Sequence, residues 1–221
     1  MTAPMSRNAF VHLSAVLACV SVSLAIACTP PAPAAPRVVD IVATDGVVLK
    51  GTLFAARTDG PAVLLLHQCD AQRGVWDPLG TRLAAAGITA LSVDYRGYGE
   101  SGGTPHDQLS GDALTKMMAT IWPSDIDAAL AFLSRQPKVN REQLGAGGGS
   151  CGVNNAVQLA RRHDSVKALA LLADQTDRDG RLFLEGMAAP PVFAAAAADD
   201  QYGNLVQIMS WLYGVSRRRV G

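Results

Sequence analysis

Beyond residue 37, the apolar residues of the chain fall into short runs that alternate with stretches of helical spacing. Short runs of this kind are typical of strands that are covered on both faces of a sheet. The first two runs flank Asp45-Gly46, a pair that favours a tight hairpin turn. The predicted strands cover residues 38–44, 47–54, 62–66, 88–93, 143–147, 166–172 and 192–198.

Three stretches between the predicted strands carry apolar residues on one helical stripe. A glycine closes the first stretch, and a capping-box pattern at residues 124–127 opens the second. Strands that alternate with helices predict an α/β fold, with a mostly parallel sheet flanked by helices. The stripes are Trp76, Leu79 and Leu83 before Gly87; Ile126, Ala129, Leu130 and Leu133; and Val153, Ala156, Val157 and Ala160.

The first 36 residues differ in composition from the rest of the chain. Arg7 precedes an apolar run at residues 9–27, which is followed by Cys28 and a proline-rich segment. This order predicts an export signal at residues 1–27, a tether at residues 28–37 and a folded domain at residues 38–221. An uncleaved membrane anchor is the alternative, because the apolar run is long enough to cross a bilayer.

The position of Cys28 resembles a bacterial lipoprotein signal, in which the cysteine becomes the lipidated first residue of the mature chain. Ala25 stands where such signals usually carry leucine, and Cys19 follows residues that fit the pattern as a second candidate. The resemblance implies an exported, periplasmic protein that is anchored to a bacterial membrane through its N-terminal lipid.

Composition limits the remaining function classes. The 221 residues carry 19 acidic and 19 basic side chains, and this neutral balance gives no support to a nucleic-acid partner. No group of histidine, cysteine and carboxylate residues has the spacing of metal ligands, so we expect no metal. An apolar share of 49% suffices for the core of one domain.

Gly148-Gly149-Ser150-Cys151-Gly152 has the form G-x-S-x-G and lies between a predicted strand and a predicted helix. This context is that of a nucleophile elbow, a strained turn that holds a serine hydroxyl above the sheet. The N-terminus of the following helix favours negative charge at the same place. Ser150 is therefore the candidate nucleophile. The alternatives are Cys151 and a glycine-rich turn without chemistry.

Together with the elbow, two further segments resemble the α/β-hydrolase family, in its dienelactone-hydrolase-like or small serine esterase branches. Residues 64–69, Leu-Leu-Leu-His-Gln-Cys, are similar to the end of the family's third strand. Residues 94–101, Asp-Tyr-Arg-Gly-Tyr-Gly-Glu-Ser, are similar to its D-x-R-G-x-G-x-S loop. The resemblance implies hydrolysis of a small-molecule ester or lactone through an acyl-enzyme, without a cofactor.

The resemblance also implies roles for residues around the elbow. The backbone N–H groups of Cys151 and Cys69 would form the oxyanion hole, with Gln68 as the alternative to Cys69. His67 would be structural and pack behind the loop. Two cysteines that serve one oxyanion site must lie close together, and an exported protein meets an oxidising compartment. A disulfide between Cys69 and Cys151 is therefore the alternative to two free thiols.

A carboxylate and a histidine would complete a triad in the order serine, acid, histidine. The resemblance places the acid at Asp200. Its neighbour Asp199 and Asp174, which follows the preceding predicted strand, are alternatives. All three aspartates would also suit loops or helix caps without any catalytic role.

No histidine follows Asp200 in the sequence. His163 stands at the far end of the helix after Ser150, roughly 16 Å or more away, and His12 lies in the export signal. His106 follows the D-x-R-G loop and is either a base or a surface histidine. Two hypotheses remain. One is a C-terminally incomplete form of an active hydrolase, whose fold lacks its last strand and helix. The other is a catalytically inactive hydrolase-fold lipoprotein that binds a small ligand or a partner.

Overall fold

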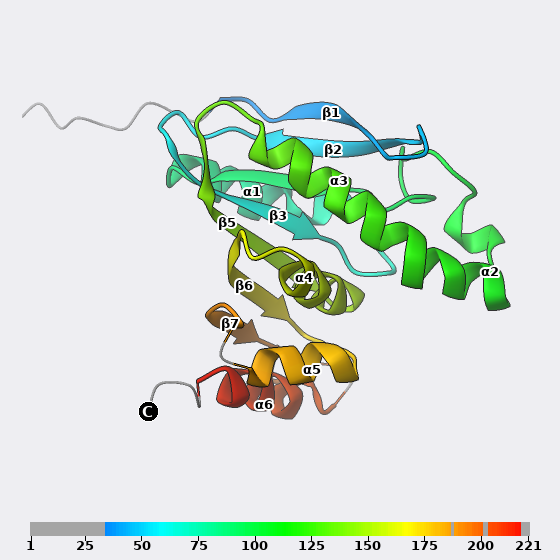
Figure 1. The fold of residues 1–221 in the computed structure, drawn as a ribbon, viewed down its shortest axis with the longest axis vertical. Helices are drawn as coiled ribbons and strands as arrows, with labels where there is room; N and C mark the ends of the chain where they lie inside the picture. Colours follow the sequence, from blue (N-terminus) through cyan, green and yellow to red (C-terminus); the bar gives the residue numbers. More distant parts are fainter. Residues whose placement is uncertain (1–33, 187, 201–202, 218–221) are drawn as a thin grey trace, which may run out of the picture. The chain divides into compact units, whose positions relative to one another are not determined.

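The computed structural model describes residues 34–186, 188–200 and 203–217, which form one sheet with helices on both faces (Figure 1). The predicted export signal, with His12 and Cys28, lies outside the described residues. The strands are β1 (Arg37–Val42), β2 (Val48–Phe54), β3 (Gly60–Leu66), β4 (Thr89–Val93), β5 (Val139–Gly149), β6 (Val166–Leu172) and β7 (Val192–Ala195). The helices are η1 (Arg73–Trp76), α1 (Asp77–Ala85), η2 (His106–Gln108), α2 (Gly111–Lys116), η3 (Met117–Ile121), α3 (Trp122–Ser134), α4 (Cys151–Arg162), α5 (Arg178–Glu185) and α6 (Leu205–Arg217).

Strands of the described part follow the order β1-β2-β4-β3-β5-β6-β7 across the sheet. β2 pairs antiparallel with β1 and with β4, and all other neighbours are parallel. The predicted fold class is therefore confirmed, and the first hairpin turns at Asp45 and Gly46 as its pattern predicted. The largest differences in extent from the prediction are in β5, which begins at Val139, and in β7, which ends at Ala195; the other strands agree to within two residues at each end.

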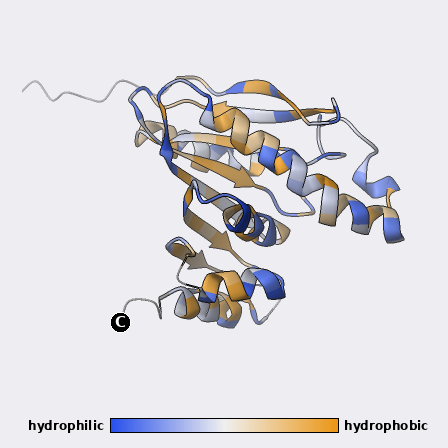
Figure 2. Cartoon of the chain, in the orientation of Figure 1, coloured by the Kyte–Doolittle hydropathy of each residue, from blue (hydrophilic) through white to orange (hydrophobic). Residues whose placement is uncertain are grey.

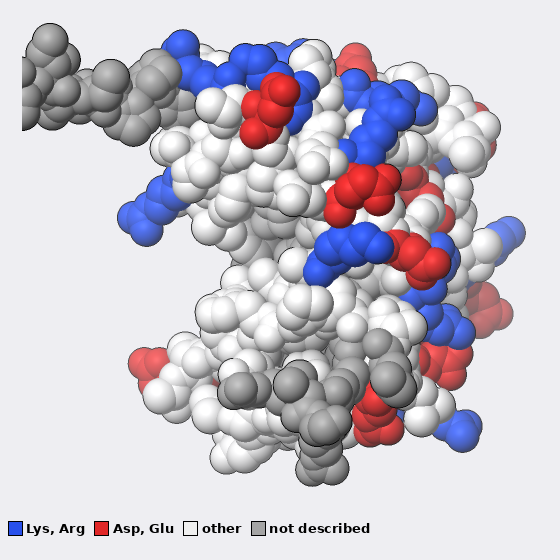
Figure 3. Space-filling view, turned by 60° about the vertical axis from the view of Figure 1, so that its left-hand side comes forward, with Lys and Arg blue, Asp and Glu red and all other residues white. Residues whose placement is uncertain are grey.

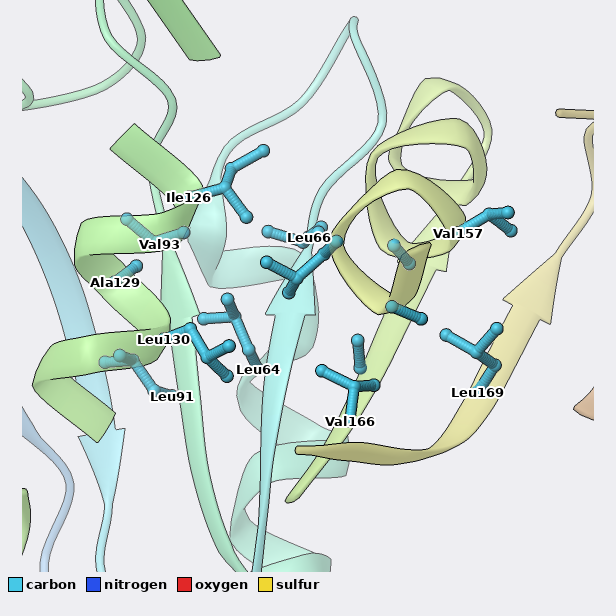
Figure 4. Packing of buried hydrophobic residues seen from close by; sticks show 14 of the residues in the cluster. Leu64, Leu66, Leu91, Val93, Ile126, Ala129, Leu130, Val157, Val166 and Leu169 are labelled. Atoms are coloured by element: carbon cyan, nitrogen blue, oxygen red, sulfur yellow. The ribbon is translucent and has the colours of Figure 1, made fainter. Parts of the chain in front are cut away.

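The apolar run of β3 supplies both sides of the core. Leu64 and Leu66 belong to the cluster that α3 and α4 cover, whereas Leu65 belongs to a second cluster on the face that α1 covers. Figure 4 shows Ile126 of α3 directed toward Leu66 of β3, and Val157 on the side of α4 that faces β6. In Figure 2 the central strands are mainly hydrophobic, and hydrophilic residues lie on the helices. Each fully buried side chain of this size contributes about 1.5–3 kcal/mol to folding.

The predicted capping box at residues 124–127 is wrong. α3 begins at Trp122, directly after η3, and no side chain caps its N-terminus. The Ser124 Oγ atom lies 3.2 Å from Thr44 Oγ1, and Asp125 is buried beside Arg96. The sequence pattern was misleading because the helical backbone continues upstream, so these side chains make tertiary contacts instead of a cap.

The predicted stripe at Trp76, Leu79 and Leu83 is confirmed in part, because Trp76 is buried and Leu83 packs against the second cluster. Gly80 and Ala84 are buried, while Leu79 is 39% exposed. A Cβ atom at position 80 would lie 2.5 Å from Cδ2 of Phe54, so the helix packs closely on β2 through its glycine. Glycine carries no weight in an apolar periodicity, so the pattern missed Gly80 and included the exposed Leu79.

An ion-pair cluster of Arg96 with buried Asp125 and exposed Asp45 holds the loop after β4. Arg96 donates through Nε and Nη2 to Asp125 of α3, at 2.9 and 2.8 Å, and through both Nη atoms to Asp45 of the first hairpin, at 2.5 and 2.8 Å. Arg96 is 7% exposed and Asp125 only 2%. Burial raises the pKa of Asp125 against the opposing effect of Arg96, whereas hydrogen bonds from Arg96 lower the pKa of Asp45 to about 2. One side chain thus joins the loop, the hairpin and α3.

Charged side chains on the surface are mixed in sign. Figure 3 shows basic and acidic side chains next to one another on the viewed face. Several of them form exposed ion pairs, such as Arg162 with Asp127 at 2.8 Å, which contribute about 0–1 kcal/mol each. Within the described ranges, no helix is long and apolar enough to cross a membrane. The same ranges hold no group of three or more His, Cys, Asp or Glu side chains suited to a metal ion.

Candidate functional site

Ser150 stands alone between the end of β5 and the first residue of α4, as the elbow pattern predicted. Its φ of 48° and ψ of −126° are unusual for a residue with a side chain. Such backbone conformations cost about 1–3 kcal/mol and persist where surrounding contacts enforce them. Here Ser150 N donates to Leu172 O at 2.9 Å, and Val153 N donates to Ser150 O at 2.7 Å.

Two glycines of the elbow are required by close backbone approaches. A Cβ atom at Gly152 would lie 2.4 Å from the carbonyl oxygen of Leu66 and 3.0 Å from that of His67. A Cβ atom at Gly148 would lie 2.0 Å from the carbonyl oxygen of Gly152. The start of α4 therefore packs directly against the end of β3. A side chain at position 152 would push α4 away from β3, and a side chain at position 148 would open the turn itself. The two glycines therefore keep the elbow tight and beside the loop after β3.

The Ser150 hydroxyl contacts a carboxylate. Ser150 Oγ donates to Oδ2 of Asp174 at 3.2 Å. Asp174 follows β6, after a residue of positive φ, Ala173 at 55°. Of the three candidate acids, Asp174 is the one with a hydrogen bond to Ser150 in the described part of the structure. The catalytic role of Asp200, placed there by resemblance, stays a prediction.

A pocket of about 620 Å³ opens beside Ser150. Asp200 lies on its wall, whereas Asp199 is an exposed residue outside its lining. Trp76 and Leu205 also line this pocket. The sequence patterns did not predict that Trp76 lines the pocket, because they marked it only as an apolar position of a helix. The other lining residues are Gln68, Cys69, Asp70, Val75, Gly149, Leu172 and Ala173.

The two predicted oxyanion donors are covalently linked. Cys69 and Cys151 form a disulfide with a Cα–Cα distance of 5.8 Å, which agrees with the predicted pairing rather than with two free thiols. Cys151 is the first residue of α4, so its N–H group has no acceptor within the helix. The carbonyl oxygen of Cys69 accepts a hydrogen bond from Tyr98 Oη at 2.8 Å. That both backbone N–H groups bind an oxyanion stays a prediction.

The three histidines of the described residues are held away from the Ser150 hydroxyl by other partners. His67 is buried, its Nδ1 atom lies 2.7 Å from Gln68 O and its Nε2 atom accepts the Tyr95 N–H group at 3.2 Å. Burial lowers the pKa of His67, which favours a neutral ring with the proton on Nδ1. This placement matches the structural role predicted for His67.

The other two histidines lie on separate features. The ring of His106 stacks on Tyr98 with centroids 3.8 Å apart, and His163 Nε2 lies 2.9 Å from Asp127 Oδ1. Tyr98 also donates to the carbonyl oxygen of Cys69, so its ring lies between His106 and the loop after β3. Neither histidine is hydrogen-bonded to Ser150, and this geometry agrees with the exclusion of His163 as its base.

Comparison with known proteins places the fold among hydrolases. No family model matches the chain. A thiohydrolase, aneE, of Aspergillus aculeatus is 28% identical over 123 residues, which cover 55% of this chain and 36% of the relative. An uncharacterized protein of Mycobacterium tuberculosis is 33% identical over 129 residues, which cover 57% of this chain and 41% of the relative. The matched segments thus span less than half of these curated relatives.

Solved structures agree with this placement. The α/β hydrolase GrgF of Penicillium sp. sh18 has a TM-score of 0.57 and 25% identity, over 69% of this chain and 52% of that one. A dienelactone hydrolase-like promiscuous phosphotriesterase from metagenomic libraries has a TM-score of 0.62 and 22% identity, over 84% of this chain and 77% of that one. The sheet order and these neighbours define a protein of the α/β-hydrolase fold. Its relatives include proteins named as hydrolases and as polyketide transferases.

Proposed function

We propose that the chain hydrolyses a carboxylic ester or lactone, with Ser150 as the nucleophile. The observation that carries this proposal is the contact of the Ser150 hydroxyl with Asp174, at a positive-φ turn beside a pocket. The names of the relatives, thiohydrolase and polyketide transferase, support acyl chemistry. The substrate class, a small ester or lactone, is the one that the resemblance to α/β-hydrolases implies. The proposed reaction needs no cofactor.

In the proposed mechanism, Ser150 Oγ attacks the acyl carbonyl carbon while Asp174 takes the hydroxyl proton. The carbonyl oxygen becomes an oxyanion, which the N–H groups of Cys151 and Cys69 bind. The C–O bond to the leaving group breaks, and the leaving oxygen receives the proton from Asp174. Water then attacks the acyl-enzyme and gives its proton to Asp174, which returns it to Ser150 as the acid product departs. Asp200 lies on the wall of the same pocket and is the alternative acid.

A carboxylate is a weaker base than an imidazole, so this arrangement will be slower than a serine–histidine–aspartate triad. The positions of His67, His106 and His163 also support a second candidate, a hydrolase-fold protein that binds a small ligand without turnover. Both candidates use the same pocket. They differ in whether Ser150 forms a covalent bond.

Covalent trapping tests the proposal. We expect a fluorophosphonate probe to modify wild-type protein at Ser150, with loss of fluoride, and peptide mass spectrometry to place the adduct there. Asp174→Asn removes the acceptor of the hydroxyl proton while keeping its shape, so it should slow trapping. Failure of the probe to modify Ser150 at high concentration, with folded protein in hand, favours the ligand-binding candidate.

We also propose that the chain is exported to the periplasm and anchored to a bacterial membrane by lipid on Cys28. The Cys69–Cys151 disulfide supports export, because disulfides persist in oxidising compartments. In a bacterial host, we expect the wild-type protein to sediment with membranes and to incorporate labelled palmitate. Cys28→Ser should abolish the labelling and release the protein, whereas Cys19→Ser should change neither. Labelling that survives in Cys28→Ser rules out this anchor.

A further inference from the structure

The disulfide links the two segments that carry the proposed oxyanion donors. Cys69 lies in the loop after β3 and Cys151 opens α4, 82 residues later in the chain. Each donor N–H group belongs to the backbone of a bridged cysteine. The bond therefore joins the two residues whose backbone N–H groups would bind the oxyanion of the transition state.

Other contacts hold these segments only in part. Tyr98 Oη holds the carbonyl side of Cys69 at 2.8 Å, and Gly152 packs against the backbone of Leu66 and His67. Within the described residues, the disulfide is the covalent tie between the two loops. Both cysteines are only partly buried, and Cys69 lines the Ser150 pocket, so a small dithiol can reach the bond.

Reduction removes the covalent restraint between these segments and forces their two sulfur atoms apart. Bonded sulfur atoms lie about 2.0 Å apart, whereas non-bonded heavy atoms need about 3.5–4.0 Å. The two thiols therefore have to separate by roughly 1.5 Å or turn away from each other. Displacements of about 1 Å in a catalytic arrangement can lower a rate by about 10²-fold.

We propose that Cys69 and Cys151 are positioning residues whose disulfide sets the oxyanion site, so that reduction by a dithiol switches hydrolysis off. This inference rests on the proposed function. In the redox step the dithiol is oxidised to its own disulfide, and its two electrons and two protons convert the Cys69–Cys151 bond into two thiols. We expect substrate binding to change less than kcat, because most of the residues that line the pocket lie outside the disulfide.

Kinetics of the purified chain before and after treatment with dithiothreitol test the inference. We expect reduction to lower kcat for an activated ester by at least about tenfold, with KM changed by less than about threefold, and reoxidation to restore kcat. A purely structural bond would instead reduce the amount of folded protein, so circular dichroism at the assay temperature accompanies each measurement. Thiol mapping under denaturing conditions confirms the redox state at both positions.

The double variant Cys69→Ala/Cys151→Ala is the matched control. It should have the low kcat of the reduced protein and should not respond to dithiothreitol. Two free thiols at these positions in untreated protein, or full kcat after verified reduction, overturn the inference while leaving the proposed function standing. Absence of both turnover and fluorophosphonate trapping in the oxidised protein overturns the proposed function, and the inference with it.

Discussion

Ser150→Ala is expected to lower kcat for an activated ester by about 10⁴–10⁶-fold, the range of losses found when one member of a serine triad is removed. Alanine keeps the Cβ atom and the positive φ of 48°, so the fold and its backbone strain should be unchanged. The rate of p-nitrophenyl acetate hydrolysis, with a thermal melt of each protein, measures both effects. Turnover that survives in Ser150→Ala would remove Ser150 from the mechanism.

Two matched variants then separate the candidate acids. Asp174→Asn removes the acceptor that lies 3.2 Å from Ser150 Oγ, and Asp200→Asn changes the carboxylate on the pocket wall. If Asp174 takes the hydroxyl proton, its variant should lose most of the activity, while the Asp200 variant retains more. The reverse order would restore the acid that the family resemblance placed at Asp200. Ser150→Gly provides a second inactive protein, and it should be more stable because glycine adopts positive φ without strain.

Most of the fold was predictable because its signals are local. The continuous apolar run of β3 marks a strand buried on both faces, and the glycines around Ser150 mark a turn in which backbones touch. The failures involve partners that are distant in sequence. Ser124 and Asp125 form a regular capping pattern, but Asp125 pairs with Arg96, 29 residues away, and no local pattern reports that contact.

The candidate site was predictable to a similar degree. The elbow pattern placed Ser150, and the family resemblance suggested that Cys69 and Cys151 lie close enough to bond, which the structure bears out. Which carboxylate reaches the hydroxyl was not predictable. The position of the Asp174 carboxylate depends on the positive φ of Ala173. Alanine seldom adopts this conformation, so the sequence does not predict the turn.

Arg96→Met is expected to reduce the free energy of unfolding by about 3–5 kcal/mol, the usual cost of leaving a buried charge without its partner. Asp125, 2% exposed, would lose both of its hydrogen bonds to the guanidinium. Urea unfolding at neutral pH measures the loss. Asp45→Asn is the matched control, because it removes the exposed partner of the same arginine and should cost less.

The double variant Arg96→Met/Asp125→Leu should recover part of the stability that Arg96→Met loses, since it removes the stranded carboxylate together with the arginine. A loss below about 1 kcal/mol in Arg96→Met, or no recovery in the double variant, would contradict a buried ion pair at this position. The loop that Arg96 holds also carries Tyr98, which donates to the carbonyl oxygen of Cys69. Arg96→Met should therefore also lower kcat in the fraction that stays folded, because the loop beside the oxyanion site loses its anchor.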